Sequence, residues 1–305
     1  MIIDKISHLS CKIIIIAIVF VFITISGCVS NTEKIISEEN IGGKYDAKIV
    51  TLEVLSEYEN PITKETDKAY FTVYEIHYFI EGEKYRGYWK PFYRDSIDWI
   101  NQNTQTNSVF LNWWDYGNLI RGGTGRDVVI SQPSKYLWIL KRAGMATRID
   151  EKTYEKEYGG FDSSERIKDV SLALTTDDIT VTNQIMDKYN AKYIFLTMGD
   201  LELFDVMTIR EGESNYTDYY TTIEISGEQQ RVPNQRFYNS TLSKLIIFNG
   251  EDLKNYRLVY ESRPQPYYKE NKEKVYKAVY NFLYGGNLTV ENTGCIKIFE
   301  YVKET

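Results

Sequence analysis

Apolar and polar positions alternate between residues 44 and 90, which predicts β-strands. Tyr74, Ile76, Tyr78 and Ile80 are spaced by two, and this period places their side chains on one face of a strand. We therefore predict a small antiparallel sheet in this region. Its strands would run through residues 48–55, 69–80 and 85–89, with a turn at Glu81–Lys84.

From residue 91 to residue 305, helical and strand periods alternate. Asp95 is a plausible N-cap for a first helix, with Ile97 and Ile100 at helical spacing. Further helices are predicted over residues 182–189, 201–208, 240–248 and 272–284, and strands over 108–111, 193–196, 256–260 and 295–302. Such alternation is typical of an α/β (α+β) domain with a mixed sheet and helices on its faces.

The N-terminus has the pattern of an export signal. Lys5 and Lys12 precede an apolar run from Ile13 to Ile25, and Ser26-Gly27-Cys28 follows. The run has the length of a signal-peptide core and is short for a transmembrane helix. We predict a signal peptide with a lipobox over residues 1–28, lipid on Cys28, and a polar tether over residues 29–43.

The alternative for this segment is an uncleaved anchor helix that starts near Cys11. In both cases the rest of the chain would lie on the extracytoplasmic face of the cell membrane. Once the signal peptide is removed and Cys28 carries lipid, Cys295 has no partner for a disulfide within the chain. Three possible N-glycosylation acceptors, Asn215, Asn239 and Asn287, are compatible with export.

Charge and composition exclude several kinds of site. The net charge is −7 and the sequence pI is about 5.2, which argues against a nucleic-acid partner because phosphate binding needs clustered Lys and Arg. Only two histidines occur, His8 in the signal segment and His77 in a strand. A histidine-based metal site or catalytic triad cannot be built from one histidine. We predict no catalytic residue, no metal and no cofactor.

The pentapeptide Trp113-Trp114-Asp115-Tyr116-Gly117 carries the chemistry of the chain. Two indole N–H donors beside a carboxylate acceptor can grip a small hydroxyl-bearing side chain. Gly117 would let the backbone bend sharply after the cluster. The alternative is that both rings belong to the core and that Asp115 caps a following helix.

This pentapeptide resembles the signature of the C-terminal globular domain of the archaeal and eukaryotic oligosaccharyltransferase catalytic subunit. The resemblance covers residues 90–303 and includes Trp99–Thr104, Val109–Asn112, Ala191–Leu196, Leu242–Phe248, Tyr256–Ser262 and Ile296–Val302. In that family the Trp-Trp-Asp triplet binds the Ser or Thr of the acceptor sequon. The resemblance implies that role for Trp113, Trp114 and Asp115.

A second family motif is only partly matched. Archaeal members carry an Asp, a Lys three residues later, and an Ile or Met four residues beyond. Asp200 and Met207 fit, but Leu203 replaces the Lys. The resemblance implies that Met207 contacts the Thr methyl group of the peptide, whereas an ordinary amphipathic helix is the alternative.

The resemblance thus implies an acceptor-binding domain without the membrane half, which holds the metal and the lipid-linked sugar. We predict a lipid-anchored, archaeal, extracytoplasmic protein that is not catalytic alone. Its partner would be an extended Ser/Thr-containing peptide or a separate full-length oligosaccharyltransferase. The alternative is a structural or adhesion lipoprotein that retained the fold.

Overall fold

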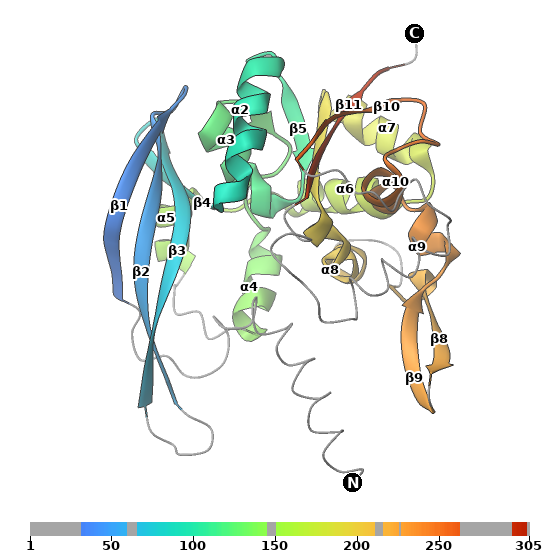
Figure 1. Cartoon of the computed structure of the whole chain (residues 1–305), viewed down its shortest axis with the longest axis horizontal. Helices are drawn as coiled ribbons and strands as arrows, with labels where there is room; N and C mark the ends of the chain where they lie inside the picture. The colour runs from blue at the N-terminus through green and yellow to red at the C-terminus, as the bar shows by residue number, and fades with distance from the viewer. Residues whose placement is uncertain are drawn as a thin grey trace.

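The computed structural model describes residues 32–59, 66–144, 151–210, 216–225, 227–262 and 295–303. The described residues form two larger sheets with helices between them and one two-stranded hairpin (Figure 1). The predicted signal peptide with Cys28, the predicted helix over residues 272–284, and the candidate acceptors Asn215 and Asn287 lie outside the described residues.

Sheet A is antiparallel and has the order β1-β2-β3-β4. Its strands are β1 (Thr32–Gly42), β2 (Ala47–Glu59), β3 (Thr66–Ile80) and β4 (Glu83–Tyr88). Ile49 pairs with Ile76, and both are buried with Tyr78 on the face that covers the core. The predicted small antiparallel sheet is therefore present. The turn predicted at Glu81–Lys84 covers only residues 81–82, because β4 begins at Glu83.

The predicted tether over residues 29–43 is corrected, because residues 32–42 form strand β1. The polar composition of this segment suggested a linker, but an edge strand needs only one hydrogen-bonded neighbour and no buried face. β1 pairs with β2 along its length. Its carboxylates also form ion pairs, Glu38 with Lys48, Glu39 with Arg94 and Glu33 with Arg86.

Sheet B is mixed, with the order β10-β11-β7-β5-β6. β5 (Val109–Asn112), β6 (Asp127–Val128) and β7 (Tyr193–Thr197) run parallel to one another, and β11 (Ile296–Tyr301) is antiparallel to both β7 and β10 (Tyr256–Glu261). All residues of β7 are buried, as expected of a central strand covered on both faces. The predicted mixed sheet is confirmed.

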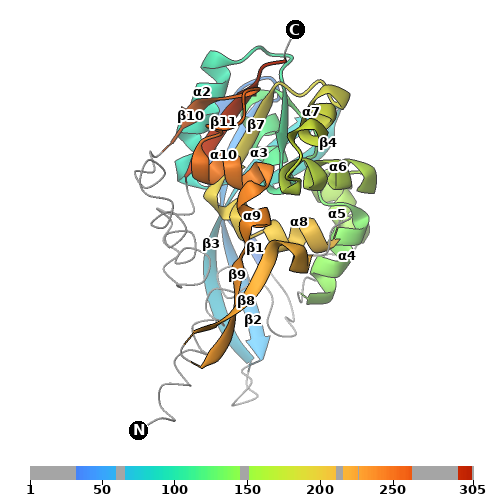
Figure 2. The same cartoon turned by 90° about the vertical axis from the view of Figure 1, so that its right-hand side faces the viewer.

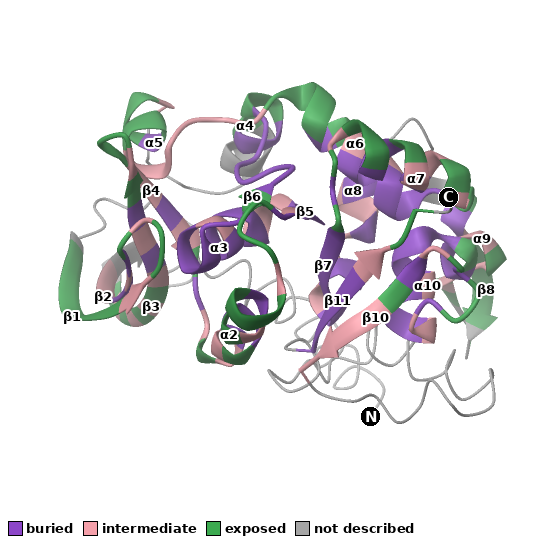
Figure 3. Ribbon diagram, turned by 90° about the horizontal axis from the view of Figure 1, so that it is seen from above, coloured by how far each residue is buried: buried purple, intermediate pink, exposed green. Residues whose placement is uncertain are grey.

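Helices lie on both faces of sheet B. Figures 2 and 3 show α2 (Arg94–Asn103) and α3 (Trp114–Thr124) on one side, and α6 (Ser164–Thr175), α7 (Ile179–Lys188) and α10 (Thr241–Phe248) on the other. The remaining helices are α4 (Lys135–Gly144), α5 (Glu151–Tyr158), α8 (Phe204–Arg210) and α9 (Gln235–Asn239), with short 3₁₀ turns η1 (Pro91–Tyr93), η2 (Met198–Leu201) and η3 (Tyr216–Tyr219). A hairpin of β8 (Tyr220–Ile225) and β9 (Glu228–Pro233) projects near α9. Within the described residues, no helix has the length and apolarity needed to cross a membrane.

Several helix boundaries differ from the sequence prediction, including the helix predicted over residues 182–189, which is α7 and begins at Ile179. Asp95 does not cap α2, because η1 runs directly into the helix and Tyr93 is already in the helical region. Asp95 lies instead in the first turn, where its negative charge suits the helix dipole. The helix predicted over residues 201–208 begins at Phe204, after the separate turn η2.

Candidate functional site

The pentapeptide lies where strand β5 passes into helix α3. Trp113 is the N-cap of α3 in an extended conformation, and Trp114 and Asp115 form the first turn. Trp113 is only 1% exposed, whereas Trp114 and Asp115 are partly exposed. At the start of α3, one indole and one carboxylate are therefore partly exposed, and the other indole belongs to the core.

Gly117 allows α3 to pack closely on the following loop. A Cβ at this position would lie 2.2 Å from the carbonyl oxygen of Ile130 and 2.3 Å from the Cα of Ser131. Asn112 ties the same parts together, because its Nδ2 donates to the carbonyls of Trp113 at 2.7 Å and Ile130 at 3.1 Å. The expected sharp bend at Gly117 is corrected, since this glycine lies inside α3 and serves close packing.

Tyr116 connects the pentapeptide to the end of β7. Its hydroxyl lies 2.7 Å from Oγ1 of Thr197 in a buried hydrogen bond. Its ring packs between Tyr93 and Phe195, with centroid distances of 6.2 and 5.5 Å. The sequence provided no signal for this contact, because Tyr116 and Thr197 are 81 residues apart.

Asp200 lies on the other side of Thr197. Its Oδ2 accepts a hydrogen bond of 2.8 Å from the Thr197 amide, and Oγ1 of Thr197 accepts from the Asp200 amide. This reciprocal capping box holds η2 against β7. Asp200 is completely buried, and its Oδ1 has no hydrogen-bond partner among the described residues.

The buried groups around Asp115 are held in their neutral forms. Burial raises the pKa of Asp200 to about 8, and the negative charge of Asp115 adds to the shift, although the Thr197 amide opposes it. Burial likewise raises the pKa values of Tyr93 and Tyr116. At the high pH where a tyrosine ionises, Asp200 has lost its proton, and the negative charges of Asp200 and Asp115 raise these pKa values further. The two carboxylates therefore lie within each other's electric field, and the fully buried one retains its proton at neutral pH.

The second motif is brought to the site only in part. Asp200 joins the pentapeptide through Thr197, whereas Met207 is 0% exposed and packs in the core. Leu203, where the family carries Lys, is also packed against the core. Glu202 lies between Asp200 and Leu203 in the sequence, and burial raises the pKa of its carboxyl to about 7.

Of the three candidate glycosylation sites, the structure describes Asn239. Its side chain is exposed at the end of α9. Thr241 of the same sequon is only 2% exposed, and its hydroxyl bonds to Thr182 and to the carbonyl of Thr176. The Thr241 hydroxyl of this sequon is therefore already hydrogen-bonded in the folded chain.

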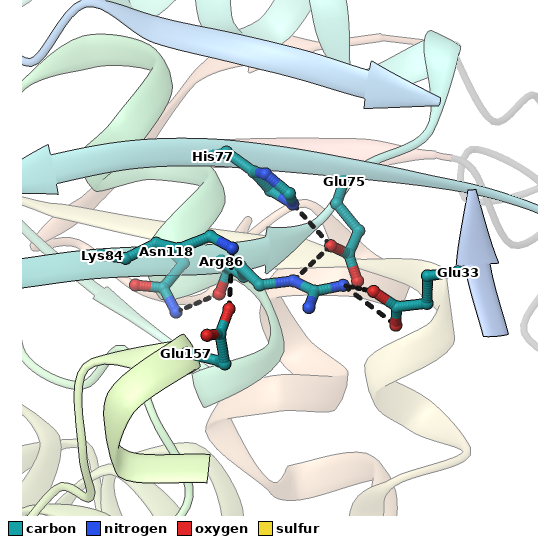
Figure 4. A network of polar contacts seen from close by, with 7 residues as sticks. All are labelled: Glu33, Glu75, His77, Lys84, Arg86, Asn118 and Glu157. Carbon is teal, nitrogen blue, oxygen red and sulfur yellow. Dashed lines mark hydrogen bonds and ion pairs between the residues drawn. The ribbon is translucent and has the colours of Figure 1, made fainter. Parts of the chain in front are cut away.

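A second polar feature lies in a cleft of about 830 Å³ on the far face of sheet A. Figure 4 shows Arg86 donating from Nε to Glu75 at 2.6 Å and from Nη2 to Glu33, while His77 contacts the same Glu75 oxygen at 2.7 Å. Burial alone would raise the pKa of Glu75, but the His77 and Arg86 hydrogen bonds outweigh it and lower the pKa. We interpret this network as structural, because Arg86 is paired with both carboxylates.

No group of three or more His, Cys, Asp or Glu side chains within the described residues could hold a metal ion. The groups at the start of α3 are a carboxylate and an indole N–H, which are a hydrogen-bond acceptor and a hydrogen-bond donor.

No family model matches the chain. Among curated proteins, it is 22% identical over 211 residues to dolichyl-phosphooligosaccharide-protein glycotransferase 3 of Archaeoglobus fulgidus, which corresponds to 60% of this chain and 21% of that protein. The chain thus spans about a fifth of the length of this relative.

Solved structures show the same likeness. The oligosaccharyltransferase of Archaeoglobus fulgidus, tethered to an acceptor peptide with the NVT sequon, matches 70% of this chain and 33% of its own at 16% identity and a TM-score of 0.45. The C-terminal globular domain of an oligosaccharyltransferase from the same organism matches 70% of this chain and 98% of its own, at 15% identity and a TM-score of 0.38. The resemblance inferred from the sequence is confirmed: the chain is similar over 211 residues to an archaeal dolichyl-phosphooligosaccharide-protein glycotransferase.

Proposed function

We propose that the chain has a role related to protein N-glycosylation, in which it binds an extended Ser- or Thr-containing peptide or assists a separate full-length oligosaccharyltransferase. The observation that carries this proposal is the start of α3, where Trp114 and Asp115 are partly exposed side by side. The sequence similarity to an archaeal glycotransferase supports the same role.

The chemistry of binding follows from these two side chains. The Asp115 carboxylate accepts the hydroxyl proton of a Thr, while the indole N–H of Trp114 donates to its oxygen. A site that hydrogen-bonds a hydroxyl favours a ligand that carries one over an analogue without it. A short flexible peptide loses conformational entropy on binding, so we expect a dissociation constant on the order of a millimolar.

Peptide titration followed by NMR tests this proposal. We expect an Asn-X-Thr peptide to shift the resonances of Trp114 and Asp115, and an Asn-X-Val peptide to leave them unchanged. Asp115→Ala should abolish the discrimination. Asp252→Ala, at an exposed position in the turn after α10, is the matched control and should bind like the wild type. Equal shifts with Thr and Val peptides would contradict peptide recognition by this site.

The burial of Trp113 and Met207 favours a second candidate function. With two of the four residues assigned to the peptide inside the core, the fold would serve as a structural or adhesion module at the cell surface. In the peptide-binding proposal these two residues belong to the core, and Trp114 and Asp115 contact the peptide. The titration separates the two functions, because a structural module would show no preference for the Thr peptide.

Membrane attachment through lipid on Cys28 belongs to the same proposal. The order of basic residues, apolar run and Ser26-Gly27-Cys28 supports it. Cys28→Ser should release the protein from membranes or block removal of the leader, and Cys11→Ser is the matched control that should do neither. Mass spectrometry of the N-terminus and membrane fractionation measure both effects. If the Cys28→Ser protein carries no lipid but stays in the membrane fraction as the wild type does, the lipid anchor is contradicted.

A further inference from the structure

The hydroxyl of Thr197 is shared between two parts of the candidate site. Thr197 ends strand β7 and is 2% exposed. Its Oγ1 accepts the amide N–H of Asp200 and also bonds to the Tyr116 hydroxyl at 2.7 Å. A hydroxyl offers one proton and two acceptor positions, so Thr197 can satisfy both neighbours at once.

Tyr116 transmits this contact to the peptide site. It directly follows Asp115 in the first turn of α3, and the rings of Tyr93 and Phe195 hold its own ring on two sides. Ring packing restricts the tilt of Tyr116, and the hydrogen bond fixes how far the ring extends toward β7. Trp114, Asp115 and Tyr116 are consecutive residues at the start of α3. Because the helical backbone is stiff, a shift of Tyr116 would also move Asp115 and Trp114.

We propose that Thr197 is a positioning residue for the peptide site, whose hydroxyl joins Tyr116 to the Asp200 turn and thereby sets the orientation of Trp114 and Asp115. This inference rests on the proposed peptide-binding function and adds a residue from a different strand to the site. The neutral form of Asp200 at neutral pH supports it, since an uncharged network can remain buried without a counter-ion.

A pair of conservative substitutions tests the proposal. Thr197→Val keeps the shape of the side chain and removes the hydroxyl, whereas Thr197→Ser keeps the hydroxyl. In the absence of peptide, Thr197→Val should shift the NMR resonances of the Trp114 indole N–H and the Asp115 amide, and Thr197→Ser should restore them. Binding of the Asn-X-Thr peptide should weaken about fivefold to tenfold in Thr197→Val and stay within about twofold of the wild type in Thr197→Ser.

Tyr116→Phe provides an independent measurement of the same bond. It should shift the same two resonances. The double variant should shift them no further than Thr197→Val alone, because Thr197→Val already removes the bond to Tyr116 together with the bond from the Asp200 amide. If Thr197→Val fails to fold, Tyr116→Phe, which keeps the ring packing, decides through the same readouts.

The outcomes separate the inference from the function on which it rests. Resonance changes confined to β7 and η2, with Trp114 and Asp115 unmoved, would overturn the positioning role. If the wild type shows no peptide binding, the peptide-binding proposal fails, while the resonances of the free protein still decide whether Thr197 orients the start of α3.

Discussion

A pair of aspartates shows how neighbouring side chains divide their protonation states. Asp200 is completely buried, and Asp115, in the first turn of α3, is partly exposed. Burial raises the pKa of Asp200 from a usual value of 3.8 to about 8, and the negative charge of Asp115 adds to this shift. In the proposed function, Asp115 is the carboxylate that accepts a ligand hydroxyl, and Asp200 is a neutral part of the framework.

The pH dependence of stability follows from this raised pKa. The unfolded chain releases the Asp200 proton near pH 4, whereas the folded chain keeps it up to about pH 8. The folded state is therefore penalised progressively as the pH rises between these values. Asp200→Asn, which cannot ionise, should gain stability relative to the wild type across this window, by roughly a few kcal/mol at pH 8.

Urea unfolding at pH 4, 6 and 8 measures this gain. Asp252→Asn, which removes one exposed carboxylate, is the control and should follow the wild type. A stability difference between Asp200→Asn and the wild type that does not change with pH would contradict a protonated Asp200.

Helix α3 packs closely against its neighbours through its glycines. A Cβ at Gly117 would meet the backbone of Ile130 and Ser131, and one at Gly122 would meet the ring of Tyr78 at 2.5 Å. The helix therefore lies close both to the loop after β6 and to sheet A. Glycines are unfavourable inside helices, so their presence here reflects the space available and not helix propensity.

Gly117→Ala should destabilise the protein by roughly 1–3 kcal/mol or more, because the new methyl group meets backbone that cannot rotate away. The start of α3 should move as well, which would also change the Trp114 resonances. Thermal unfolding and NMR measure the two effects. Gly199→Ala is the matched control, since its Cβ would meet only Thr197 Oγ1, at 3.4 Å. Equal melting temperatures for both variants would show that the α3 contact is not tight.

Helix α3 is joined to sheet A by the buried Asn118. Asn118 accepts a hydrogen bond of 2.6 Å from the hydroxyl of Tyr78 in β3. Its Nδ2 donates to the carbonyl of Arg86 in β4 at 2.8 Å, and Figure 4 shows this second bond. The same helix begins at the end of β5 in sheet B. Through Asn118, the strands of sheet A are coupled to the helix that carries the candidate site.

Asn118→Ala should weaken this coupling across the whole molecule. The Tyr78 hydroxyl and the Arg86 carbonyl would lose their partner in a buried place, which costs roughly 1–3 kcal/mol for each group. Hydrogen exchange should quicken in β3 and β4 more than in β7. Tyr78→Phe removes only one of the two bonds and should have a smaller effect. A change in exchange limited to α3 would contradict a link between the sheets.

The amino-acid pattern alone predicts much of the architecture. Strands such as β3 follow from the period-two spacing of Tyr74, Ile76, Tyr78 and Ile80, and the Trp-Trp-Asp segment is recognisable from its residue types. The polar strand β1 was missed, because its stability comes from pairing with β2 and from ion pairs, which leave no period of apolar residues. The hairpin β8–β9 was missed as well.

The sequence by itself determined the local elements and the chemical groups that the site contains, since periodicity and residue type act between near neighbours in the chain. Only the tertiary structure decided which groups are buried and which meet. Trp113 and Met207 are in the core, Trp114 and Asp115 are partly exposed, and Thr197 reaches Tyr116 across 81 residues. These outcomes depend on the order of strands in sheet B, because that order places β7 beside β5.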